Sequence, residues 1–104
     1  MAKRGYVYIL ASKRNGTLYI GVTSDLQRRI NEHRAKAKTG FTSEYNVSLL
    51  VHVEEYPSMR DAIVREKQLK KWNRSWKLNL IEQVNPTWRD LYMELPVAAT
   101  GTFG

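Results

Sequence analysis

The sequence predicts a small α+β domain in which helices flank a three-stranded antiparallel sheet, in the order ββαβααα. Two runs of β-forming residues near the N-terminus are joined by a turn with Asn-Gly, a strong hairpin signal. A third such run covers residues 47–56, and most other stretches carry apolar residues at helical spacing. With 104 residues, we expect one domain over residues 1–94 and a flexible tail over residues 95–104.

The first two strands are expected over residues 5–11 and 18–22. Successive side chains of a strand point to opposite faces. One face of the hairpin is therefore aliphatic and predicts a core. The other face carries Tyr8, Tyr19 and the bare Gly21, which is a less obvious core surface.

Helices are expected from about Ser24 to Lys36, from Ser58 to about Trp72, and over residues 76–83 and 88–93. Ser58 is a suitable N-cap for the second helix, with Asp61 placed for a capping box. Gly40 is expected to terminate the first helix, and a loop over residues 41–46 follows it. An edge strand is expected over residues 47–56, a break over residues 73–75 and a turn over residues 85–87.

Three polar side chains fall on helix faces where apolar residues would be expected. Arg29 and His33 lie on the apolar stripe of the first helix, and Glu66 lies on that of the second. A buried carboxylate without a partner is costly, so Glu66 needs a cation, a metal or strong hydrogen bonds. Either Arg29 and Glu66 form a structural ion pair beside Tyr8 and Tyr19, or these residues form a functional site.

The composition favours a polyanionic partner. The net charge is +7, from 17 Lys and Arg against 10 Asp and Glu, which favours nucleic acid first and an acidic membrane second. Without cysteine there is no disulfide, thiolate nucleophile or Cys-type zinc site, and two histidines argue against a His-rich metal site. The apolar runs are too short to span a membrane and the N-terminus lacks a secretory signal, so we expect a cytoplasmic protein.

Basic residues are concentrated in two segments. Residues 67–77 contain five Lys and Arg and no acid, and a second basic run lies in the first helix. Two such runs beside one candidate site predict a nucleic-acid-binding surface made of Arg28, Arg34, Lys67, Lys70, Lys71, Arg74 and Lys77. Trp72 and Trp76 lie within the second run, and we assign both to the core, where tryptophans of small domains more often lie.

The order of these residues resembles the GIY-YIG nuclease family. The resemblance is carried by Val7-Tyr8, Tyr19-Ile20-Gly21, then Arg29, His33 and a helical Glu66. The section EKQLKKWNRSWKLNLIEQVNPTWRDL resembles the small stand-alone bacterial members, which consist of the nuclease domain alone. The resemblance covers roughly residues 5 to 92.

The resemblance implies a metal-dependent endonuclease that hydrolyses phosphodiester bonds in DNA, on structured or single-stranded substrates. By this resemblance Tyr8 and Tyr19 position or deprotonate the attacking water, with help from His33. Arg29 steadies the phosphate, and Glu66 holds one Mg²⁺ ion, for which Mn²⁺ can substitute.

Two further residues match the family at structural positions. Gly21 leaves space at the site, and Asn85 matches a recurring asparagine. The family points to DNA more than RNA, to DNA repair, and to no obligate protein partner.

The sequence departs from the family at two positions. Tyr6 stands where the first motif has glycine, and Val22 stands where some relatives have a lysine. Two other hypotheses therefore stay open. One is a nucleic-acid-binding module of the same fold that cuts poorly or not at all. The other is an interaction domain in which Arg29 and Glu66 pair only structurally.

Overall fold

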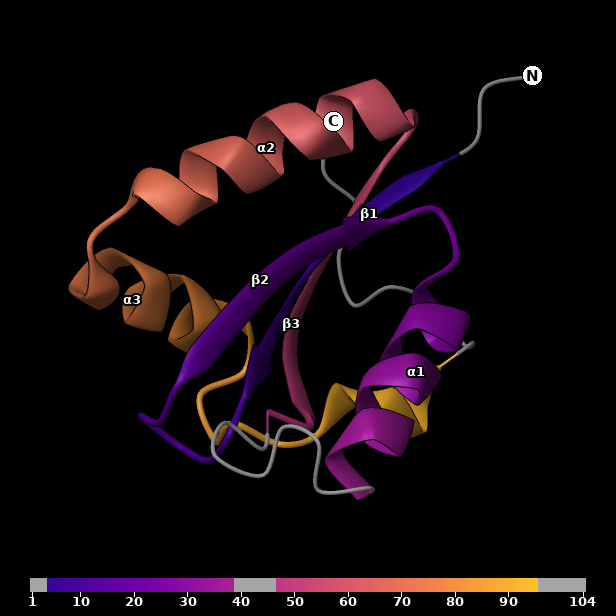
Figure 1. The fold of residues 1–104 in the computed structure, drawn as a ribbon. Coiled ribbons are helices and arrows are strands. Elements are labelled where there is room, and N and C mark those ends of the chain that lie inside the picture. Colours follow the sequence, from indigo (N-terminus) through magenta and orange to yellow (C-terminus); the bar gives the residue numbers. More distant parts are fainter. Residues whose placement is uncertain (1–3, 39–46, 96–104) are drawn as a thin grey trace.

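A computed structural model gives the fold and describes residues 4–38 and 47–95 (Figure 1). The predicted class is confirmed, since the described chain forms a three-stranded antiparallel sheet with strand order β2-β1-β3. The strands are β1 (Gly5–Ala11), β2 (Leu18–Thr23) and β3 (Leu49–Tyr56). The helices are α1 (Leu26–Lys38), α2 (Met59–Lys71) and α3 (Arg74–Val84), followed by the 3₁₀ turn η1 (Leu91–Glu94).

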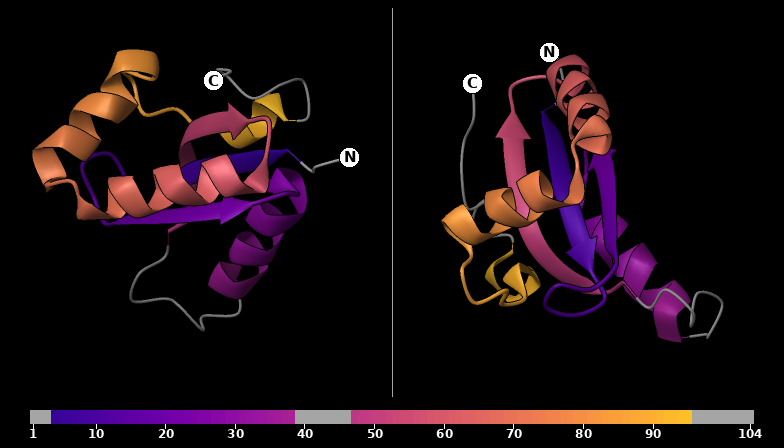
Figure 2. Two further views of the ribbon diagram at one scale, coloured as in Figure 1. Left: turned by 90° about the horizontal axis from the view of Figure 1, so that it is seen from above. Right: turned by 90° about the vertical axis from the view of Figure 1, so that its left-hand side faces the viewer.

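Helices cover both faces of the sheet (Figure 2). On one face, α2 and α3 pack against a cluster that includes Val7, Ile9 and Ile20. On the other face, α1 and η1 pack against a cluster that includes Tyr8 and Leu10. The alternation read from the first strand is therefore confirmed, and the tyrosine face is the one that α1 covers.

One predicted helix start is confirmed, and two others differ from the prediction. Ser58 caps α2 as expected, because its hydroxyl accepts from the Asp61 amide. The break predicted over residues 73–75 is wrong beyond Asn73, whose side chain accepts from the Trp76 amide and lets α3 begin at Arg74. The last helix was predicted from Trp88, whose φ of 57° excludes a right-handed helical turn, and η1 begins only at Leu91.

Some expectations concern residues outside the described ranges. The terminator at Gly40, the loop over residues 41–46 and the tail over residues 96–104 belong there. Leu95, the last described residue, packs against the second core cluster. None of the helices in residues 4–38 and 47–95 is long and apolar enough to cross a membrane.

A β-bulge in β3 determines which of its side chains face α2. Leu10 pairs with Leu50 and Ile9 with His52, so Val51 is an extra residue without a partner on β1. The Val51 carbonyl accepts instead from Nδ2 of the buried Asn85, at 3.1 Å. Asn85 thus fixes the connection after α3 to the edge strand β3.

Candidate active site

Three aromatic side chains from β1, β2 and α1 meet on the tyrosine face of the sheet. The Tyr8 hydroxyl lies 3.1 Å from Nε2 of His33. The ring centroids of Tyr19 and His33 are 4.9 Å apart, and those of Tyr8 and Tyr19 are 6.3 Å apart. The structure therefore brings together three predicted site residues that are separated along the chain. Tyr8 is buried, whereas Tyr19 is 45% exposed and accessible to a substrate.

Gly21 makes this arrangement sterically feasible. It pairs with Tyr8 across β1 and β2, and a Cβ atom at position 21 would lie 2.3 Å from the Tyr8 hydroxyl oxygen. The predicted role of Gly21, to leave space at the site, thus has a specific physical basis: a side chain there would occupy the position of the Tyr8 hydroxyl.

We expect Gly21→Ala to displace the Tyr8 ring and break its hydrogen bond to His33. If the cluster catalyses proton transfer, the cleavage rate should fall by about 10²-fold, at the low end for a general acid–base group. The measurement is a single-turnover cleavage rate. A spectrum that is sensitive to the surroundings of the Tyr8 hydroxyl shows whether the ring has moved. An unchanged rate in a folded Gly21→Ala protein would contradict a catalytic role for Tyr8.

The Tyr8 phenol is protonated in this site. Burial raises its pKa, and the charges of Tyr19, Glu66 and Glu32 raise it further, while Arg29 lowers it. Burial outweighs the Arg29 cation in setting this pKa. Tyr8 therefore keeps its proton, and its hydroxyl lies within hydrogen-bond distance of Nε2 of His33.

Arg29 lies at an open pocket beside the first turn of α1. The pocket has a volume of about 290 Å³ and is lined by Thr23, Ser24, Asp25, Arg28, Arg29 and Glu32. Nη1 of Arg29 lies 3.6 Å from Glu32, and Nε of Arg28 lies 3.6 Å from the same carboxylate. Arg29 is more exposed than its place on the apolar stripe predicted, with 47% of its side chain accessible. Sequence reasoning missed Glu32, which holds both guanidinium groups.

Glu66 has a different partner from the one considered. Oε2 of Glu66 lies 3.1 Å from Nζ of Lys70, one helical turn later. Among the described residues, Arg29 pairs with Glu32, so the structural Arg29–Glu66 ion pair is not formed. The Glu66 side chain is 14% exposed, and its charge contributes to the raised pKa of Tyr8.

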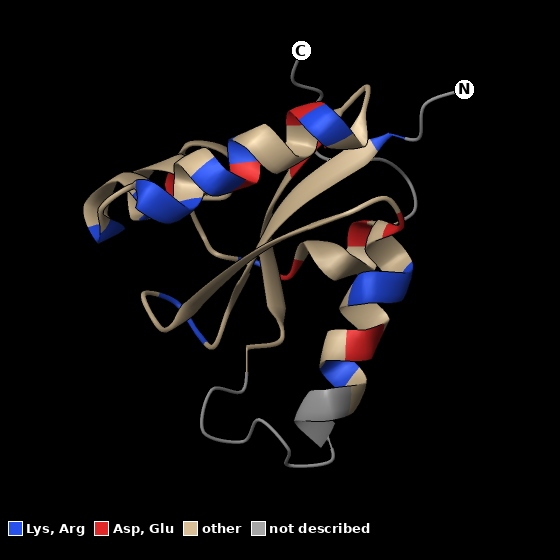
Figure 3. Cartoon of the chain, turned by 45° about the horizontal axis from the view of Figure 1, so that its top comes forward, with Lys and Arg blue, Asp and Glu red and all other residues tan. Residues whose placement is uncertain are grey.

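The basic residues predicted for nucleic-acid binding separate into two groups. Lys and Arg gather at the C-terminal end of α2 and the start of α3 (Figure 3). Arg28, Lys67, Lys70 and Lys71 are exposed, and Lys77 is half-buried. Arg34 instead pairs with Asp90 and stacks over Tyr92 at 4.2 Å, and Arg74 donates to the carbonyls of the β1–β2 turn. These last two arginines hold the fold together.

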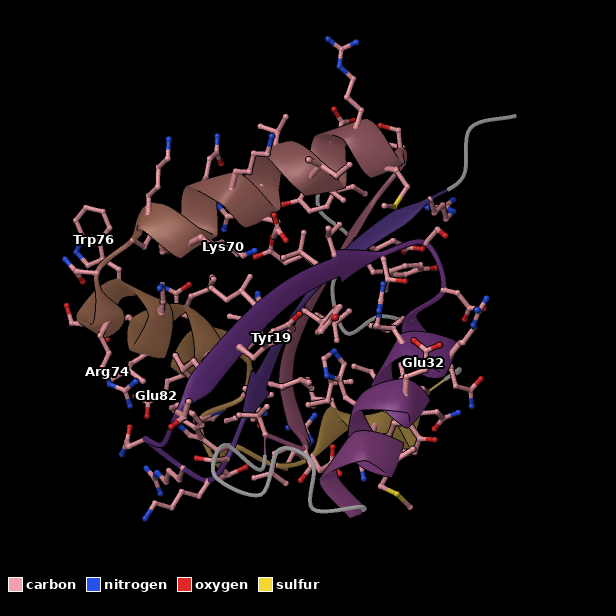
Figure 4. All side chains as sticks on the ribbon, in the orientation of Figure 1. Tyr19, Glu32, Lys70, Arg74, Trp76 and Glu82 are labelled. Carbon is pink, nitrogen blue, oxygen red and sulfur yellow. The ribbon has the colours of Figure 1, made fainter. Side chains whose placement is uncertain are left out.

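The two tryptophans differ in burial. Trp72 is partly buried and packs against the first core cluster, in keeping with the core assignment. Trp76 is 55% exposed, so its assignment to the core is wrong. It is the third residue of a helix whose N-terminus lies at the edge of the domain, and its ring points outward (Figure 4).

Sequence reasoning also missed a buried charged cluster on the opposite face of the sheet. The fully buried carboxylate of Glu54 accepts hydrogen bonds from His52 at 2.8 Å, Tyr56 at 2.7 Å and Arg65 at 2.9 and 3.2 Å. Burial acts to raise the pKa of Glu54, but the hydrogen bonds from His52, Arg65 and Tyr56 outweigh it and lower the pKa to about 2. The only sequence signal was an acid within a strand.

The remaining predicted residues lie outside the aromatic cluster. Asn85 contacts the Val51 and Arg89 carbonyls on the β3 side of the sheet, so it is structural but not at the site. Val22 packs toward α2, on the face opposite Tyr8. Tyr6, which stands at the motif glycine, donates to Glu55 at 3.2 Å.

The fold and the tyrosine–histidine cluster define a class of protein. A family model described as the GIY-YIG catalytic domain matches residues 4–79, and the chain belongs to this family of nucleases. The resemblance stated from the motif is thereby confirmed.

Within that family, the chain is similar to UPF0213 proteins. It is 39% identical to one from Syntrophus aciditrophicus over 84 residues, which are 80% of this chain and 94% of that protein. It is 37% identical to UPF0213 protein SH2523 from Staphylococcus haemolyticus, over 80% of this chain and 99% of that protein. The solution NMR structure of UPF0213 protein BH0048 from Bacillus halodurans matches with a TM-score of 0.51 and 28% identity, covering 89% and 97% of the two chains.

Proposed function

We propose that this protein is a Mg²⁺-dependent endonuclease that hydrolyses phosphodiester bonds in DNA. The observation that carries the proposal is the environment of one hydroxyl group. The Tyr8 hydroxyl is hydrogen-bonded to His33, its ring centroid lies 6.3 Å from that of Tyr19, and the charges of Arg29, Glu66 and Glu32 act on its pKa. Packing of a buried phenol does not by itself require both a cationic and an anionic side chain nearby.

The residues present fit a divalent metal of the magnesium type. The described residues contain no group of three or more His, Cys, Asp or Glu that could enclose an ion. Magnesium keeps several of its waters and is commonly held by one or two carboxylates together with substrate phosphate oxygens. The mostly buried Glu66 carboxylate would hold it. When bound, the ion supplies charge that stabilises the phosphate and the leaving oxygen.

The protein's own residues then provide proton transfer and charge stabilisation. As water attacks phosphorus, a new P–O bond forms and the bond to the leaving oxygen breaks. The water proton passes to Tyr8 while the Tyr8 proton passes to His33, whose Nε2 acts as the acceptor. The guanidinium of Arg29, at the edge of the open pocket, binds the phosphate as its negative charge grows.

The direct test is cleavage of labelled DNA and RNA. Single strands, duplexes, flaps and forks are each incubated with Mg²⁺, with Mn²⁺ and with EDTA. The proposal expects DNA cleavage that requires a metal and is abolished by EDTA. Binding to the whole set without any cleavage would overturn it and favour the binding-module hypothesis, which the Glu66–Lys70 ion pair also supports.

Two neighbouring arginines provide a matched pair of variants. Both contact Glu32, but Arg29 also lowers the pKa of Tyr8. Arg29→Ala is expected to lower the rate at saturating DNA by about 10²- to 10³-fold, as for loss of one transition-state donor. Arg28→Ala should weaken DNA binding and its salt dependence while leaving that rate within a few-fold. Equal loss of rate in both variants would argue against a specific role for Arg29.

A further inference from the structure

The junction of α2 and α3 carries a groove that the candidate active site does not use. It has a volume of about 180 Å³ and is lined by Trp72, Trp76, Asn79, Leu80 and Gln83. The two indole rings meet edge to face, with centroids 5.8 Å apart and planes at 87°. The groove thus offers one aromatic surface that is partly buried, one that is exposed, and two amide side chains.

The inner side of this groove is held rigidly. The guanidinium of Arg65 lies over the Trp72 ring, 5.0 Å from its centroid. Arg65 is itself fixed by two hydrogen bonds to the buried Glu54. A contact surface that is already ordered loses little conformational entropy on binding. The buried cluster therefore orients Trp72 from behind, and Trp76 remains the accessible ring.

The charge around the groove indicates the kind of partner. Residues 67–77 contain five basic residues and no acid. Lys67 and Lys71 are exposed on α2, and Lys77 lies one residue after Trp76. Exposed aromatic rings beside a basic track are the arrangement by which proteins bind single-stranded nucleic acid, through base stacking and phosphate contacts.

We propose that this groove stacks an unpaired base of a nucleic-acid strand on Trp76, with Asn79 and Gln83 able to reach the edge of the base. The inference rests on the proposed function, because it assumes a nucleic-acid substrate. It adds that this substrate contains an unpaired nucleotide. The groove begins at Trp72, the C-cap of the helix that carries Glu66, and the six residues from Glu66 to Trp72 correspond to about 9 Å of helical rise. One strand can therefore contact both regions.

The test measures binding apart from cleavage. Affinity for a short labelled single-stranded DNA and for the matching duplex is measured in EDTA, for the unmodified protein and for Trp76→Ala, Trp76→Phe and Val84→Ala. Val84 is the matched control, since it is also apolar and exposed on α3. Circular dichroism and thermal melting establish that each variant is folded.

Trp76→Ala is expected to weaken single-strand binding by roughly 5- to 150-fold, the range of losses when one stacked base loses its aromatic partner. Trp76→Phe should retain most of the affinity, and Val84→Ala all of it. Duplex binding should change less than twofold in each variant. A single abasic site, moved along the oligonucleotide, should cost affinity at one position with the unmodified protein and not with Trp76→Ala.

Three results would overturn the inference. Trp76→Ala could bind the single strand as tightly as the unmodified protein, or lose duplex affinity equally. Trp76-dependent self-association in sedimentation, without an effect on DNA, would identify a second copy as the occupant. Metal-dependent cleavage is scored separately, so the nuclease proposal can fail while stacking holds, and stacking can fail while cleavage is observed.

Discussion

Glu66→Gln is expected to reduce metal-dependent cleavage to background, a loss of at least about 10³-fold, while the protein stays folded and binds DNA. Glutamine has the same shape as glutamate but lacks the charge needed to hold a divalent ion. The fold should tolerate the change, because the partner of Glu66 is Lys70, whose side chain is 55% exposed. Because Lys70 stays hydrated when the pair is lost, the cost should be below the ~3–5 kcal/mol of breaking a fully buried pair. Cleavage rates across a Mg²⁺ titration, together with denaturant unfolding, test both parts.

Asp61→Asn is the matched control, since Asp61 is an exposed acid in the first turn of the same helix. It should cleave normally. If Glu66→Gln instead destabilises the protein by several kcal/mol and cleaves at the normal rate, Glu66 is a structural residue, and the interaction-domain hypothesis gains support.

Glu54→Ala is expected to lower the free energy of unfolding by about 3–5 kcal/mol, as for removal of one member of a buried ion pair. The substitution leaves His52, Tyr56 and Arg65 without the carboxylate that accepts their hydrogen bonds. Domains of this size are commonly stable by only about 5–15 kcal/mol, so a large part of the stability is involved. Urea unfolding measures the change. Glu55→Ala is the control, because this neighbouring acid lies on the other face and is partly exposed.

The same group predicts a pH dependence. The pKa of Glu54 is about 2 in the folded protein, against an ordinary value of 4.5. Between these values the unfolded chain binds the proton and the folded protein does not, so stability falls as the pH is lowered from about 4.5 towards 2. Glu54→Gln should remove about one proton from this dependence. An identical pH profile in Glu54→Gln and the unmodified protein would show that other groups cause acid unfolding.

Local signals in the sequence were sufficient to predict most of the fold. Asn15 adopts the left-handed conformation that the Asn-Gly turn predicted, and Ser58 caps α2. The periodicities of two and 3.6 placed the strands and the first two helices within a few residues. The aromatic cluster was also predicted, because Tyr8, Tyr19 and His33 fall on faces that a hairpin and the following helix must bring together.

The features that were missed depend on contacts between distant residues. Arg34 looked like a free cation, but it pairs with Asp90, 56 residues later. Glu54 looked like an acid near the end of an edge strand. The bulge at Val51 shifts the strand by one residue, and the face on which His52 and Glu54 lie is then covered by Arg65 of α2. No local sequence pattern predicted this bulge. The exposure of Trp76 could not be predicted locally either, because it depends on how α3 packs relative to α2.

The bulge in β3 couples two positions that are 34 residues apart in the chain. Deleting Val51 would leave the pairs on either side of it in register, but it would remove a fully buried residue of the first core cluster. The deletion would also remove the Val51 carbonyl, which accepts a hydrogen bond from Asn85. A buried amide that lacks this acceptor would lower the free energy of unfolding. Among the described residues, loss of the bulge would therefore leave the Arg89 carbonyl as the remaining acceptor of the Asn85 amide.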